Sequence, residues 1–105
     1  MTAISLIREI VKASDDEERY YYKRLLDKEL RRSFRDLVPR KYLFFPQNPI
    51  SYIRDRFLYI EFESWGKRAY RNLLSFFESD LRNFFKIDVE RFNGKTTFII
   101  KEARI

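Results

Sequence analysis

The sequence predicts an α+β fold in one domain that spans residues 1–105, and three observations predict it. Apolar residues recur at helical spacing in the first third of the chain and again over Trp65–Phe84. Apolar and polar residues alternate on both sides of Asn93-Gly94. With two glycines and three prolines in 105 residues, the loops should be short. We therefore expect N-terminal helices, a long helix in the C-terminal half, and a small antiparallel sheet that ends in a β-hairpin.

Two helices are expected at the N-terminus. Thr2 can cap the first, which ends near Ala13. The segment Ser14–Glu17 has the pattern of a capping box, so a second helix is expected from Asp15 to Leu37. Pro39 disfavours helix at the residue before it and marks the end. The acidic start of this helix suits the positive end of the helix dipole, which explains its carboxylates without a metal site.

The middle of the chain is harder to assign. Lys41–Phe45 is a short apolar run between prolines and indicates a strand, and Gln47–Pro49 indicates a turn. Ile50–Phe62 is compatible with both regular structures, because its apolar residues fit a helical face and its residue types favour a strand. We expect a short helical turn over Ile50–Arg54, followed by a strand over Phe57–Phe62.

The long helix in the second half can be capped by Ser64. Three cations, Lys67, Arg68 and Arg71, occupy its first turns, where they oppose the helix dipole. Contact with phosphate or another acidic group is one explanation, and solvation is the other. The continuous apolar face of the helix comprises Trp65, Ala69, Leu73, Phe76, Phe77, Leu81 and Phe84.

The C-terminal hairpin follows from its turn. Asn93-Gly94 is the dipeptide that a two-residue type I′ turn prefers. Pairing about this turn places Val89 opposite Phe98. The same register places Ile87 opposite Ile100, so one face of the hairpin is apolar.

The net charge of +6 is concentrated in one part of the chain. Residues 31–71 hold ten Lys and Arg against four Asp and Glu, and elsewhere the charges cancel. Aromatic residues are interspersed among these cations. Such a basic segment suits a polyanionic partner, most often nucleic acid. The chain has neither Cys nor His, which excludes disulfides, Cys/His zinc sites, thiol nucleophiles and Ser-His-Asp triads.

The order of elements over residues 15–101 resembles the winged-helix family of DNA-binding domains. The resemblance implies that Ile50–Phe62 contains the second helix. It also implies that the helix from Lys67 enters the major groove of DNA and that the C-terminal hairpin forms the wing. The localised charge of +6, the cationic start of the long helix and the basic hairpin make a duplex DNA-binding regulator or accessory factor the leading hypothesis. Its candidate nucleic-acid-binding residues are Lys67, Arg68, Arg71, Asn72, Arg54, Arg56, Arg40, Lys41, Arg91 and Lys95.

Two other binding functions remain open. The alternation of Phe57, Tyr59 and Phe62 is similar to that of strands whose aromatics stack on RNA bases, although alternate core residues give the same pattern. The alternative to nucleic-acid binding is a protein–protein interaction module, an assembly subunit or inhibitor, whose interface uses Arg31–Lys41 and the tyrosines. Tyr20–Tyr22 suggests a homodimer contact, because tyrosine is favoured at interfaces.

No enzyme activity, cofactor or metal is expected. Carboxylates at Asp88 and Glu90, or at Glu61 and Glu63, have a spacing that can bind Mg²⁺, but a solvated strand face has the same spacing. No apolar run approaches a membrane span, and a charge pair lies early in the N-terminal segment. We therefore expect an intracellular, cytoplasmic protein. The many charges and single Gln are also typical of heat-adapted proteins.

Overall fold

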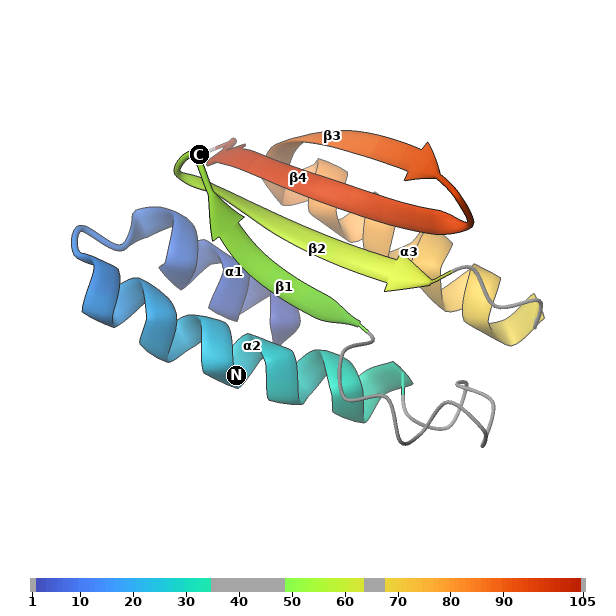
Figure 1. Ribbon diagram of the computed structural model, residues 1–105, viewed down its shortest axis with the longest axis horizontal. Coiled ribbons are helices and arrows are strands. Elements are labelled where there is room, and N and C mark those ends of the chain that lie inside the picture. Colours follow the sequence, from blue (N-terminus) through green and yellow to red (C-terminus); the bar gives the residue numbers. More distant parts are fainter. Residues whose placement is uncertain (1, 35–48, 64–67, 105) are drawn as a thin grey trace.

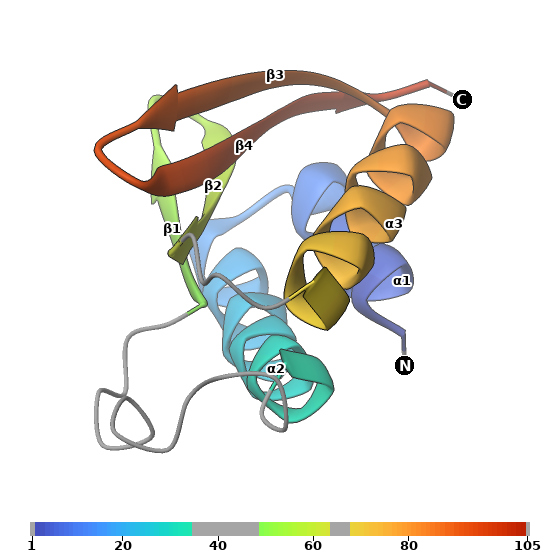
Figure 2. The same cartoon turned by 90° about the vertical axis from the view of Figure 1, so that its right-hand side faces the viewer.

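The computed structural model describes residues 2–34, 49–63 and 68–104, and this part of the chain forms an α+β fold. Its three helices pack on one face of a four-stranded antiparallel sheet, and no described helix covers the other face (Figures 1 and 2). The elements in chain order are α1 (Ala3–Lys12), α2 (Asp16–Phe34), β1 (Ile50–Arg54), β2 (Phe57–Glu63), α3 (Arg68–Phe84), β3 (Phe85–Phe92) and β4 (Lys95–Ala103).

The caps of the N-terminal helices agree with the sequence in one case and differ in the other. The hydroxyl of Thr2 accepts the backbone N–H of Ser5 at 3.2 Å, so the predicted cap of α1 is confirmed. The capping box predicted for Ser14 is wrong, because the carboxylate of Asp15 accepts the backbone N–H of Glu18 at 2.8 Å. A charged acceptor makes the stronger bond here. The expected strand at Lys41–Phe45 lies outside the described residues.

The predicted pairs of the C-terminal hairpin are confirmed, and the register shifts only beyond them, between Lys86 and Ile87. The sheet order is β1-β2-β4-β3, and β3 pairs with β4. Val89 lies opposite Phe98. Asn93 and Gly94 form the two-residue turn with φ values of 51° and 72°, as a type I′ turn requires. The hairpin therefore follows from its turn residues and its alternation alone.

The helical turn expected at Ile50–Arg54 is wrong, since this segment is strand β1. It pairs antiparallel with β2, with Arg54 opposite Phe57, through a turn formed by Asp55 and Arg56. Backbone pairing with β2 outweighs the apolar spacing that also fitted a helix. The winged-helix resemblance expected the second helix of a helix-turn-helix here, and the structure has two strands. Membership of that family stays a prediction.

The core lies between the sheet and the helices. Phe62, Phe77 and Phe98 meet edge to face there, with ring centroids 5.7 to 6.0 Å apart. This packing fixes the helices against the sheet and so fixes where their outer faces point. The buried core residues are Leu6, Ile7, Ile10, Leu26, Leu30, Leu58, Ile60, Phe62, Leu81, Phe85, Phe98 and Ile100.

Candidate nucleic-acid-binding surface

The structure describes seven of the ten residues predicted to bind nucleic acid. Arg40, Lys41 and Lys67 lie outside the described residues. The other seven are all exposed at the surface. They are Arg54, Arg56, Arg68, Arg71, Asn72, Arg91 and Lys95.

These seven residues are divided between opposite ends of the molecule. The pairing of Glu63 with Lys95 places the C-terminal end of β2 beside the β3–β4 turn. The first residues of β2, next to the β1–β2 turn, lie about 20 Å away, at the far end of the strands. Arg54 and Arg56 are therefore not brought together with the cations of α3.

The end that faces the viewer in Figure 2 gathers elements that are far apart in the sequence. It includes the last two turns of α2, the first turn of α3 and the β3–β4 turn. Four exposed cations lie on the two helices there, and none forms an ion pair or a side-chain hydrogen bond within residues 2–34, 49–63 and 68–104. We call this set the basic end; it consists of Lys28, Arg31, Arg68 and Arg71.

The hairpin cations near this end are partly neutralised. Arg91 donates to the carboxylate of Glu78 at 3.0 Å, and Lys95 lies 3.9 Å from that of Glu63. Both cations can still add to a positive field, but each already has an acidic neighbour. Such pairs reduce the attraction that a cation offers to a further anion.

The start of α3 carries cations without an acidic residue in its first turn. Arg68 and Arg71 lie in its first turns, and no acidic residue accompanies them there. The helix N-terminus carries partial positive charge, so these side chains are repelled by their own helix. Exposure to water keeps the cost small. An anion bound here would interact favourably with both the side chains and the helix end.

Sequence reasoning missed the contribution of α2. Lys28 and Arg31 follow Arg24 at intervals of four and three residues, so the three share one face of the helix. All three are exposed and have no ion-pair partner in the described part of the chain. The helical spacing was available in the sequence, but the position of the α2 end near the start of α3 was not.

Arg32 lies next to this face of α2 but, unlike the three cations on it, forms an ion pair. Its guanidinium donates to the carboxylate of Glu29 at 2.6 Å. The hydrogen bond and the charge of Glu29 raise the pKa of Arg32 above its usual value. Arg32 is therefore paired locally, whereas Arg31 has no ion-pair partner among residues 2–34, 49–63 and 68–104.

The uncovered face of the sheet is polar and aromatic rather than basic. Tyr52 and Tyr59 stack on it with centroids 5.1 Å apart. The Tyr52 hydroxyl donates to Glu61 at 2.8 Å, and burial together with this bond raises the pKa of Tyr52 to about 12. Phe62 points to the opposite face and is fully buried, so it cannot stack on bases as the RNA-binding pattern required. The carboxylates that alternate on this face are Glu61, Glu63, Asp88 and Glu90.

These carboxylates do not form a metal centre in the described residues. Asp88 is bound by Lys101 at 2.6 Å, and this hydrogen bond raises the pKa of Lys101. No group of three acidic side chains there is close enough to hold a metal ion. Asp88 and Glu90 point to solvent, away from the apolar face of the hairpin, as expected.

The comparisons with known proteins add no relative. Family models, curated proteins and solved structures were all searched, and none of them matches this chain. Among the described helices, none is long and apolar enough to cross a membrane. The functional argument therefore depends on the residues and their placement.

Proposed function

We propose that this chain binds duplex DNA through the phosphate backbone, with the basic end as its contact surface. The observation that carries the proposal is the presence of four exposed cations on the parts of α2 and α3 that lie at one end of the molecule, none of them paired within the described residues. A regulatory or accessory role would follow from such binding.

The expected mode of binding is largely independent of base sequence. Lysine and arginine that contact phosphates release condensed counterions, so affinity should fall steeply as salt rises. Asn72 is exposed one turn after Arg68 on α3. Arginine and asparagine can each read a base edge with two hydrogen bonds, so these two residues are the candidates for base contacts.

A charge-reversal experiment tests the proposal. The variant Arg68→Glu/Arg71→Glu should weaken binding to random duplex DNA by about 100-fold at 50 mM salt, since each lost phosphate contact costs roughly tenfold. Acidic residues suit a helix N-terminus, so this variant should stay folded. Fluorescence anisotropy measures the affinity, and circular dichroism checks the fold.

The matched control reverses the same number of positive charges at the other end of the molecule. Lys12→Glu/Arg54→Glu alters two exposed cations, one at the end of α1 and one beside the β1–β2 turn. Its affinity should stay within about threefold of the unmodified protein, because long-range charge effects are screened over about 10 Å at 0.1 M salt. Equal losses in the two variants would show that only net charge matters and would overturn the assignment.

A second candidate function is a protein–protein interaction module, including a homodimer. The observation that favours it is exposed aromatic surface: Tyr20 and Tyr21 on α2 are 51% and 59% exposed, and Phe76 on α3 is 73% exposed. Light scattering would measure the oligomeric state directly. Failure to bind random duplex DNA near 50 mM salt would favour this function over the first.

A further inference from the structure

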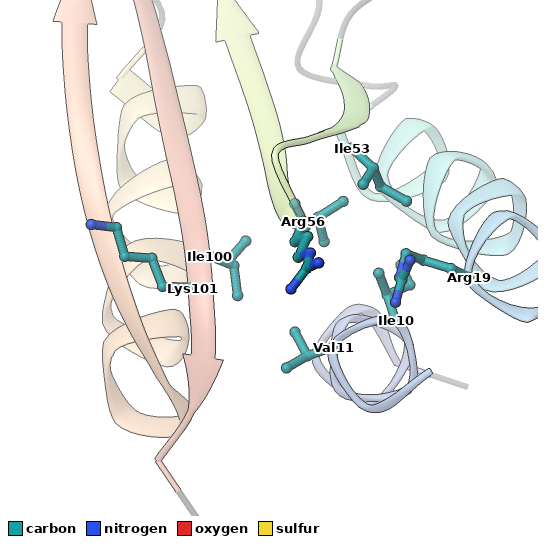
Figure 3. A pocket seen from close by; sticks show the side chains of 8 residues that line it. Ile10, Val11, Arg19, Ile53, Arg56, Ile100 and Lys101 are labelled. Carbon is teal, nitrogen blue, oxygen red and sulfur yellow. The ribbon is translucent and has the colours of Figure 1, made fainter. Parts of the chain in front are cut away.

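We propose that a small cavity at the end of the molecule away from the basic end binds a small oxyanion, a phosphate or carboxylate group. The cavity lies between α1, the start of α2, the β1–β2 turn and β4, and has a volume of about 40 Å³ (Figure 3). It is lined by Ile10, Val11, Arg19, Ile53, Arg56, Leu58, Ile100 and Lys101. This inference is independent of the proposed DNA-binding function.

Among the described residues, the lining combines apolar side chains with cations and includes no acidic side chain. Figure 3 shows the guanidinium of Arg56 between β4 and α1, and that of Arg19 beside α1. The ammonium of Lys101 points away, toward Asp88 on the open face of the sheet. Two guanidinium groups therefore supply the positive charge.

Arg19 is held in place before any ligand arrives. Its Nη1 donates to Asp16 at 2.7 Å and its Nη2 donates to the carbonyl oxygen of Ala13 at 2.9 Å. The Arg19 side chain is 23% exposed, whereas that of Asp16 is 83% exposed. Solvent therefore screens the carboxylate more than the guanidinium. A guanidinium has five N–H donors, so Arg19 keeps donors for an anion.

Arg56 occupies a backbone position that disfavours it. Its φ of 72° lies in the left-handed region, where glycine or asparagine is the usual residue of a two-residue turn. A side chain other than these costs about 1 kcal/mol or more there. Arg56 forms no ion pair within the described residues. Strained residues cluster at binding sites, and this one carries an unpartnered charge into the cavity.

The size and chemistry of the cavity limit the kinds of ligand that it can bind. A volume of about 40 Å³ accepts one small group rather than a drug-sized molecule. The planar fork of a guanidinium matches the oxygens of phosphate and carboxylate with two parallel hydrogen bonds. A single oxyanion that accepts from Arg56 and Arg19 would fill this space.

The test is a titration of the full chain with sodium phosphate at constant ionic strength, followed by amide NMR. Saturable shifts are expected at the lining residues of α1, β2 and β4. Arg56→Gln should weaken this binding at least tenfold. Arg54→Gln, a neighbour whose side chain lies on the open face of the sheet, should bind as the unmodified protein does.

Two further measurements distinguish phosphate from carboxylate as the ligand and separate this proposal from the proposed DNA binding. Titration with acetate shows whether a carboxylate replaces phosphate. Arg68→Glu/Arg71→Glu should retain phosphate binding at the cavity, whatever happens to its DNA affinity. Shifts that do not saturate, that spread over all cationic surfaces, or that persist unchanged in Arg56→Gln would overturn the proposal. Absence of binding by both phosphate and acetate would do the same.

Discussion

The two β-turns of the sheet have the same shape and very different sequences. Asn93-Gly94, near the basic end, and Asp55-Arg56, at the cavity end, both take positive φ at both positions. The first uses the residues that such a turn prefers, and the second places arginine where glycine is usual. Local sequence and fold thus agree at one end and conflict at the other. Conflicts of this kind are expected at functional or strained sites.

The two ends also use their cations differently. At the basic end the four cations are exposed on two helices and are accessible to a large partner. At the cavity end Arg19 and Arg56 lie around a small, partly apolar space. The first arrangement suits an extended polyanion, and the second suits a single anionic group. The comparison therefore predicts two ligands of different size on one small protein.

The largest expected effect tests whether the basic end is one continuous surface. Lys28→Glu/Arg31→Glu on α2 should weaken duplex binding by about 100-fold at 50 mM salt, as the α3 pair should. If one duplex contacts both helices, the four-residue variant should lose about 10⁴-fold, measured by fluorescence anisotropy. Unchanged affinity in the α2 variant would show that α2 is not part of the surface.

A smaller effect, on the free energy of unfolding, is expected from substitutions in the two β-turns. Arg56→Gly should raise the free energy of unfolding by about 1 kcal/mol, because glycine adopts the left-handed region without strain. Gly94→Ala should lower it by about 1 kcal/mol, since its φ is 72° although no atom lies within 4 Å of the added Cβ. Urea denaturation measures both changes.

The double variant Arg56→Gly/Gly94→Ala checks these two effects on stability. The two turns lie at opposite ends of the sheet, so the effects should add in the double variant. Destabilisation by Arg56→Gly would mean that the arginine side chain stabilises the fold by more than its backbone strain costs. That result would replace ligand binding with packing as the reason for Arg56.

The smallest expected effect is on the pH dependence of stability and involves Tyr52, on the uncovered face of the sheet. Burial and the bond to Glu61 raise the pKa of Tyr52 from 10.0 to about 12. The folded state thus holds this proton more tightly, so the contribution is present below pH 10 and is lost as pH rises through 12. Tyr52→Phe should show a shallower loss of stability between these values in pH-dependent denaturation. Parallel curves would contradict the assigned pKa.

Sequence reasoning succeeded where a local rule has one solution. Asn93-Gly94 fixed the hairpin register. The apolar spacing of α3 located the side that packs on the core at Leu73, Phe77 and Leu81, but Phe76 and Phe84 of the same predicted face are exposed. It failed at Ile50–Arg54, because a five-residue apolar segment satisfies both helix and strand patterns until a pairing partner is known. The turn at Asp55-Arg56 carries no strong turn signal, so the β1–β2 hairpin could not be found from its residues.

The sequence identified cations as the candidate binding residues, but it did not reveal which of them lie together in the fold. The cations of Arg68 and Arg71 were identified because they oppose the dipole of their own helix. Arg54 and Arg56 were grouped with them by proximity in sequence, although the antiparallel pairing sends them to the other end. Lys28 and Arg31 join the basic end through the tertiary packing of α2, which no local pattern reveals.

The most direct test of the account is the salt dependence of duplex DNA binding. For the unmodified protein, the slope of log affinity against log salt should be about −3 to −4, which corresponds to roughly four phosphate contacts. In Arg68→Glu/Arg71→Glu the slope should be less steep by about 2. A slope near zero in the unmodified protein, or an identical slope in both proteins, would contradict phosphate binding at the basic end.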